Sequence, residues 1–306
     1  MTHIILTQTT RRKDDQIMNT LKRISLISLC IAMLLSLSSC FSTPSIEDIF
    51  DIDMDVTLEQ KTVYDENGIK ITSKSLSENV DRNGRLIDPK ILLTFDVENT
   101  SSENLLITAD YLCVNNIMAA AFWDGHCPAG ATTELIFELS PPTLSDDGIS
   151  VIKDIELSFR IENSETYDLI TITSPITLKT SADANYVQPL KDEGTVVYDG
   201  SEAKIVIYES DDLLRLYVNN KMDQVINVKA TCVSINGEKF EGFDCVNHVV
   251  PGKHGHENIG FPRDKITEGA SNELGIHVVI CDNSGKNMAF VKEIKDLGIV
   301  TVTVDK

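Results

Sequence analysis

Three histidines close together near residue 250 are the sharpest chemical feature of the sequence. His248, His254 and His256 lie within nine residues, beside a cysteine and a glutamate. If this segment is a β-strand, alternation places His254 and His256 on the same face. Two imidazoles on one face can bind Zn²⁺ or Cu²⁺ when a third ligand joins them. The alternative is an exposed polar strand next to a Pro-Gly turn, with no metal bound.

Cysteine chemistry is a second possibility. Of the seven cysteines, Cys30 and Cys40 belong to an apolar segment near the N-terminus. Five remain in the body of the chain: Cys113, Cys127, Cys232, Cys245 and Cys281. An odd number cannot all pair within one chain. Pairing of Cys113 with Cys127 and of Cys232 with Cys245 stays open, beside an interpretation of all five as small buried hydrophobic residues.

Motifs that carry enzymatic chemistry are missing from the sequence. It contains no G-x-S-x-G, no H-E-x-x-H, no P-loop and no glycine-rich dinucleotide fingerprint. We therefore predict a protein that is not an enzyme and that needs no cofactor. Net charge is −20, from 27 Lys and Arg against 47 Asp and Glu. This acidity argues against nucleic-acid binding, which needs clustered positive charge.

Residues 18–41 have the layout of an export signal. Lys22 and Arg23 precede an uncharged, mostly apolar run over residues 24–37. That run is shorter than the ~20 apolar residues of a membrane-spanning helix, and small residues follow it. Residues 37–40 read Leu-Ser-Ser-Cys, which resembles a bacterial lipobox. The alternative is a signal anchor that remains uncleaved.

The lipobox resemblance implies that residues 1–39 are a signal peptide and that Cys40 becomes the lipidated first residue of the mature protein. Two or more acyl chains would give stable membrane anchoring. We expect a lipoprotein of the bacterial cell envelope, exposed on the extracytoplasmic side. Residues 1–17 carry charges ahead of a second methionine and break this layout. Translation from Met18 would remove them.

An internal repeat organises the rest of the chain. Residues 62–71 read TVYDENGIKI and residues 196–205 read VVYDGSEAKI. Residues 93–99 and 214–220 then match as LTFDVEN and LRLYVNN. A further asparagine follows 16 residues after each of these segments, and a turn with Pro and Gly comes next. Order and spacing both hold, so the repeat predicts two homologous domains.

The expected boundaries follow from the repeat. The first domain spans residues 57–181 and the second spans residues 192–306. A polar linker over residues 182–191 joins them, and an acidic spacer over residues 40–56 follows the lipid.

Each copy has the pattern of β-structure. Polar and apolar residues alternate over residues 69–74 and 93–98, and β-branched residues are dense. Asn-Gly pairs mark turns at residues 67–68 and 236–237. Helix is scarce, with short candidates near residues 142–149 and 263–269. The fold class predicted is all-β, with two tandem antiparallel β-sandwiches.

These motifs together carry a resemblance. V-Y-D…I-K-I, an apolar strand ending in V-x-N, V-N-G/N and then Pro-x-Gly resemble the tandem Ig-like modules of bacterial surface lipoproteins. The second copy departs from the pattern, because Pro251 and Gly252 are adjacent. The Cys…Trp…Cys hallmark of antibody domains is also missing. The resemblance implies an Ig-like fold and surface placement, but no activity.

The function expected is binding or adhesion at the surface, with a protein or glycan as partner. Specificity should lie where the copies differ, and Phe122 and Trp123 are candidate anchors if they are exposed. Burial of both rings in a sandwich core is the alternative. Two other functions remain open: metal capture through His254, His256 and His248, and a spacer or assembly subunit that binds no soluble ligand.

Overall fold

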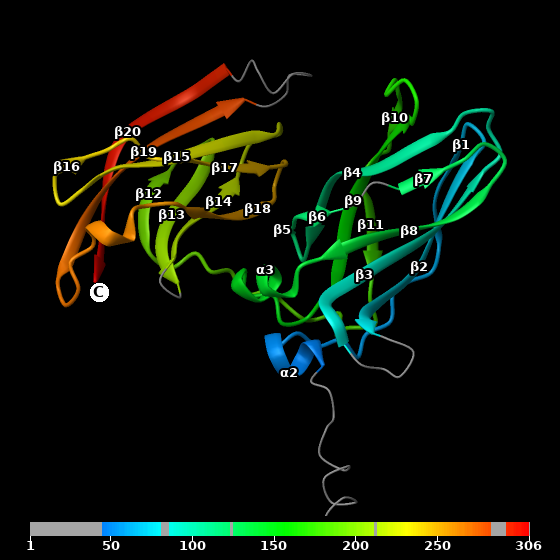
Figure 1. The fold of residues 1–306 in the computed structure, drawn as a ribbon, viewed down its shortest axis with the longest axis horizontal. Helices are drawn as coiled ribbons and strands as arrows, with labels where there is room; N and C mark the ends of the chain where they lie inside the picture. Colours follow the sequence, from blue (N-terminus) through cyan, green and yellow to red (C-terminus); the bar gives the residue numbers. More distant parts are fainter. Residues whose placement is uncertain (1–44, 81–85, 123–124, 211–212, 283–291, 306) are drawn as a thin grey trace, which may run out of the picture. The chain divides into compact units, whose positions relative to one another are not determined.

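The computed structural model describes residues 45–80, 86–122, 125–210, 213–282 and 292–305 (Figure 1). Ser45–Lys306 forms one compact unit. The signal peptide, the start at Met18, the lipidation site at Cys40 and the ring of Trp123 lie outside the described residues. Within the described part of the chain, no helix is long and apolar enough to cross a membrane.

The fold is all-β with antiparallel sheets, as the alternation predicts. In the first half one sheet has the order β1 (Thr62–Glu66), β2 (Ile69–Val80), β3 (Leu86–Asn99), β8 (Thr132–Leu139) and β6 (Ala121–Phe122). The second sheet of this half contains β10 (Leu169–Ile172), β9 (Asp154–Asn163), β4 (Leu105–Val114) and β5 (Ile117–Met118). In that sheet β11 (Ile176–Lys179) also pairs with β9, and β7 (Gly125–Cys127) with β4.

The second half repeats this strand order (Figure 1). One sheet has the order β12 (Thr195–Asp199), β13 (Ala203–Ser210), β14 (Leu213–Asn220) and β18 (His254–Ile259). The other contains β16 (Glu238–Lys239), β15 (Ile226–Ile235), β19 (Ser271–Asp282) and β20 (Lys292–Asp305), with β17 (Asp244–Val249) paired to β15. A parallel bridge between Ile117 of β5 and His254 of β18 makes one continuous sheet of ten strands.

Residues that the repeat aligns occupy the same register. Tyr64 pairs with Ile71 between β1 and β2, and Tyr198 pairs with Ile205 between β12 and β13. A register shift lies just before each tyrosine. The matching bulges follow from the matching sequence, since a bulge is a local feature of one strand pair.

A buried asparagine ends the third strand of each half. Asn99 and Asn220 are both 1% exposed. The Nδ2 of Asn99 donates to the carbonyl of Cys127, and that of Asn220 donates to the carbonyl of Val249. Each side-chain amide thus satisfies a buried backbone carbonyl beside the turn that carries Pro and Gly. This shared role explains why both copies have an asparagine at this position.

Separate apolar clusters fill the two halves. The rings of Phe95, Phe137 and Phe159 meet at the centre of the first, with centroids 5.2–6.0 Å apart. The second cluster is mainly aliphatic, with residues such as Leu216 and Ile276 fully buried. Both clusters arise from the alternation along the strands, which turns every second side chain inward.

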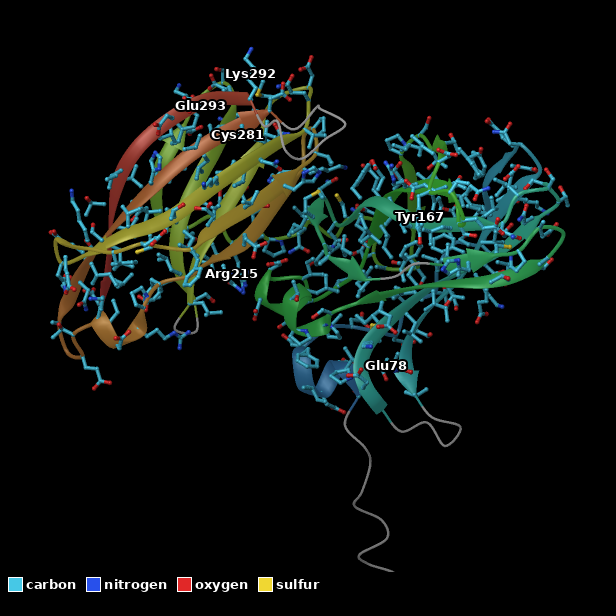
Figure 2. All side chains as sticks on the ribbon, turned by 45° about the horizontal axis from the view of Figure 1, so that its top comes forward. Glu78, Tyr167, Arg215, Cys281, Lys292 and Glu293 are labelled. Carbon is cyan, nitrogen blue, oxygen red and sulfur yellow. The ribbon has the colours of Figure 1, made fainter. Side chains whose placement is uncertain are left out.

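The structure corrects the expectation of an acidic spacer over residues 40–56. Its described part, residues 45–56, packs against the first half and is not a solvated tether. The helix α2 (Ile46–Phe50) begins at Ser45, which forms a capping box with Asp48. Ile46 and Ile52 are completely buried, and the N–H of Ile46 donates to Oε1 of Glu78 at 2.8 Å, at the end of β2 (Figure 2). Isoleucines spaced between the acids, which composition alone hides, drive this packing.

Two further short helices lie where the sequence suggests them. The helix α3 (Pro141–Asp146) begins with Ser140 as N-cap, and a 3₁₀ turn, η1, spans Arg263–Lys265.

Residues of the expected linker, 182–191, contact the first half. Nε2 of Gln188 donates to the carbonyl of Gly148, and Leu190 packs against the first apolar cluster.

Candidate functional site

His254 and His256 lie on the same face of β18, as alternation predicts. Tyr217 of β14 pairs with His256, so its side chain shares that face. Leu216 and Val218 on either side of Tyr217 point into the second apolar cluster. The histidines therefore lie on the opposite face of the sheet from that core.

Each of these histidines is bonded to a tyrosine. The hydroxyl of Tyr217 lies 2.9 Å from Nδ1 of His254, and that of Tyr208 lies 2.9 Å from Nδ1 of His256. The ring of Tyr217 also stacks on His254, with centroids 5.8 Å apart and planes 16° apart. Burial lowers the pKa of His254, and burial with the nearby charge of Arg215 lowers the pKa of His256 to about 3. Both imidazoles are therefore neutral at pH 7.

A buried ion pair lies on the same face. Nη2 of Arg215 is 2.5 Å from Oδ1 of Asp147, the residue that follows α3. The two side chains are 4% and 2% exposed (Arg215 is labelled in Figure 2). Burial raises the pKa of Asp147 to about 7, and the guanidinium of Arg215 limits that rise. Nη1 of Arg215 lies 3.5 Å from Asp146, so the cation faces two carboxylates.

A polar pocket of about 280 Å³ opens beside His254. We call it the His254 pocket, and its polar lining residues are Asn115, Asn116, Lys153, Asp154, Tyr186, Gln188 and His254. Because Tyr217 engages Nδ1 of His254, Nε2 is the nitrogen that remains for a ligand. The pocket thus offers an imidazole, an ammonium, amides, a carboxylate and one phenol ring.

Internal bonds hold the lining of the His254 pocket in place. Asn115 adopts a left-handed conformation (φ 51°), and its Oδ1 accepts the N–H of Lys153. Its Nδ2 donates to Oε1 of Gln188 at 2.8 Å. Nζ of Lys153 donates to the carbonyl of Tyr186, also at 2.8 Å. These bonds fix the pocket walls before any ligand binds.

The three histidines of the metal hypothesis do not converge. His248 lies on β17, in a different sheet from His254 and His256, and its Nδ1 is bonded to Asn227. Across the residues that the structure describes, no three His, Cys, Asp or Glu side chains are grouped to hold a metal ion. The sequence thus placed His254 and His256 correctly on one face, but the described residues bring no third ligand to them.

The candidate aromatic anchors are only partly described. Phe122 belongs to β6 and pairs with Glu138 of β8. Trp123 lies outside the described residues, so its role as an anchor stays a prediction.

All five body cysteines are free thiols, so neither disulfide left open by the sequence forms. Cys113, Cys127, Cys232 and Cys245 are buried, and Cys281 is partly exposed. Burial raises the pKa of Cys113 and of Cys245 to about 12. These thiols are thus protonated and act as small hydrophobic residues.

Sequence reasoning missed the partners of the histidines and the buried ion pair. One signal was available, because Arg215 is a single charge inside the apolar run Leu213–Asn220. A lone arginine in a buried strand needs a buried acid. Its partner Asp147 is 68 residues away, so the sequence offered no way to select it.

Removal of the Tyr217 hydroxyl tests the tyrosine–histidine bond. We expect Tyr217→Phe to lower the free energy of unfolding by about 0.5–1.5 kcal/mol, since the half-buried His254 loses the hydrogen bond to its Nδ1. Chemical denaturation followed by circular dichroism measures this. Tyr167→Phe is the control, because Tyr167 is 67% exposed (Figure 2) and should change stability by no more than about 0.5 kcal/mol. Equal effects of the two changes would contradict the assignment.

Comparison with known proteins adds no relative. A scan against protein-family models and a search of curated proteins both find no match to this sequence. Function is therefore inferred from the residues and contacts of the chain itself.

Proposed function

We propose that this chain is a lipid-anchored, non-enzymatic binding protein of a bacterial cell envelope, with two homologous Ig-like domains. The sequence Leu-Ser-Ser-Cys at residues 37–40, directly after an apolar run, supports the anchor on Cys40. The shared strand order and the matching bulges before Tyr64 and Tyr198 support the homology. On this proposal the first domain reaches back to residue 45.

The observation that carries the binding function is the His254 pocket. Its donors and acceptors come from amide, ammonium, carboxylate and imidazole groups, and the half-buried Tyr186 adds a ring face. Such a lining suits a sugar residue, whose hydroxyls both donate and accept hydrogen bonds and whose C–H face packs on an aromatic ring. We therefore favour a glycan as the partner.

The ionisable groups beside the pocket hold structural partners. Nζ of Lys253 bridges Asn116 and Glu156, at 2.8 Å from each side-chain oxygen. Nδ1 of His254 is held by Tyr217. These bonds hold Lys253 and His254 in place beside the pocket.

Glycan binding can be measured directly. The full chain with Cys40→Ser, which removes the proposed lipidation site, would be applied to an array of bacterial and host glycans. We expect a glycan whose binding falls at least about tenfold in Lys153→Met, which removes one ammonium donor from the pocket. Lys61→Met is the control, because Lys61 is half-buried, pairs with Glu59 and does not line the pocket. Equal binding by both variants, or hydrolysis of the bound glycan, would contradict the proposal.

The anchor has a separate test. Cells that express the full chain would be fed an alkyne fatty acid, and we expect label on the wild-type protein and none on Cys40→Ser. The variant should also leave the membrane fraction. Label retained by Cys40→Ser would place the lipid on another residue, and a wild-type protein without label would carry no lipid. Either result would contradict the anchor proposal and leave the glycan proposal unaffected.

A further inference from the structure

A second pocket, of different chemistry, lies in the second half of the chain. It has a volume of about 350 Å³ and is lined by Phe240, Glu241, Gly242, Phe243, Gly260, Phe261, Pro262 and Lys265. We call it the phenylalanine pocket. Phe243 is 83% exposed, more than any other large hydrophobic residue described. A pocket rich in aromatic rings that opens to solvent is a recognised form of ligand site.

One wall of this pocket is held by the backbone. The N–H of Phe240 donates to the carbonyl of Val233 at 3.1 Å. Gly242 packs so closely that a Cβ there would lie 1.9 Å from the carbonyl oxygen of Cys232. Only glycine allows this approach, and it fixes the segment that carries Phe243.

The opposite wall is held as firmly. The turn η1 is closed by a bond from the N–H of Lys265 to the carbonyl of Pro262 at 3.2 Å. Nζ of Lys265 forms an ion pair with Glu238, which ties this wall to the segment before Phe240. Phe261 also packs against the second apolar cluster. Bonds and packing within the chain therefore hold both walls of the pocket.

Charge at the pocket favours a cation. Glu241 is exposed and makes no ion pair with any described residue, whereas the charge of Lys265 is compensated by Glu238. One net negative charge therefore remains among these three side chains, in a chain of net charge −20. Faces of aromatic rings also attract cations.

We infer that the phenylalanine pocket binds the alkylated ammonium group of a small organic cation. Methyl groups of such a cation can pack on the rings of Phe240, Phe243 and Phe261, while its charge interacts with the rings and with Glu241. A bare ammonium is strongly hydrated, so placing it against an apolar pocket wall costs hydration free energy. This inference concerns a different site and does not rest on the proposed glycan binding.

Choline and its neutral isostere, 3,3-dimethylbutan-1-ol, test the role of charge. The full chain with Cys40→Ser would be titrated with each, and the Kd measured by ligand-observed NMR. We expect choline to bind about tenfold more tightly than the isostere, because only choline gains the cation–π and carboxylate interactions. Equal affinities, or no binding of choline, would overturn the inference.

Two variants locate the binding. Glu241→Gln should weaken choline binding about fivefold and leave the isostere unchanged, because it removes charge and keeps shape. Phe243→Ala should weaken the binding of both ligands, and because Phe243 is 83% exposed the variant should fold like the wild type. Glu66→Gln, on β1 in the other half of the chain, is the charge-matched control. Choline binding that falls equally in Glu241→Gln and Glu66→Gln would overturn the site.

Free choline and phosphatidylcholine carry the same group, so a third arm separates these sources. Binding of the chain to phosphatidylcholine vesicles, weakened by Glu241→Gln, would identify a lipid headgroup as the source. Binding of choline without binding to vesicles would identify a free cation. Vesicle binding that Glu241→Gln leaves unchanged, with no binding of choline, would overturn the inference.

Discussion

Phe95→Ala is expected to lower the free energy of unfolding by about 3–5 kcal/mol, the largest effect that we predict for a single side chain. Phe95 is completely buried and meets Phe159 at 5.2 Å and Phe137 at 5.9 Å between centroids, in edge-to-face geometry. Its removal loses the transfer free energy of the ring, two aromatic contacts and the volume that it fills. Urea denaturation followed by circular dichroism measures the change.

Phe243→Ala is the matched control for this prediction. It deletes the same ring from a position that is 83% exposed, so we expect a change within about 0.5 kcal/mol. If Phe95→Ala were as mild as Phe243→Ala, the three-ring core of the first half would be wrong. The same control shows whether Phe243→Ala is folded well enough for the choline titrations.

Arg215→Met should produce the second largest loss, and its size should depend on pH. Asp147 would remain buried with no guanidinium beside it. Removal of one partner from a buried ion pair costs about 3–5 kcal/mol while the other partner stays charged. The pKa of Asp147 in the folded chain is about 7. Without Arg215 this pKa rises further, so we expect a larger loss at about pH 8.5 than at about pH 5.5, where the carboxyl is protonated with or without Arg215.

Wild-type stability should follow the same carboxyl. The folded pKa of Asp147 lies above its ordinary value of 3.8, so the folded chain holds this proton more tightly than the unfolded chain. The contribution of Asp147 to the free energy of unfolding is fully present below pH 3.8 and is lost as the pH rises through about 7.

Arg160→Met is the control for Arg215→Met, because Arg160 is 40% exposed and its pair with Glu162 should contribute no more than about 1 kcal/mol at either pH. A pH-independent effect of Arg215→Met would contradict the assignment.

Local patterns in the sequence were enough to predict the strands. Tyr64 and Tyr198 have the same neighbours in sequence, and both occupy the same register beside a bulge. Alternation also placed His254 and His256 on one face, because side chains of a strand alternate whatever covers the sheet. These features depend on residues close together in the chain.

Features that depend on distant residues could not be predicted in this way. Tyr217 is 37 residues from His254, and only the pairing of β14 with β18 brings their rings together. Residues 45–56 were misjudged for a related reason, since their acids dominate the composition while two isoleucines decide the packing. The phenylalanine pocket needs two loops to meet, and no periodicity in either loop indicates that.

The packing of residues from Ser45 onward against the first half sets a limit on how far that half can lie from residue 40. Four residues lie between Cys40 and Ser45, and the five Cα-to-Cα steps span at most about 18 Å when the chain is fully extended. With the proposed lipid on Cys40, Ser45 would stay within that distance of the lipidated residue. On that proposal α2, and the end of β2 that Glu78 ties to it, form the membrane-proximal end of the protein.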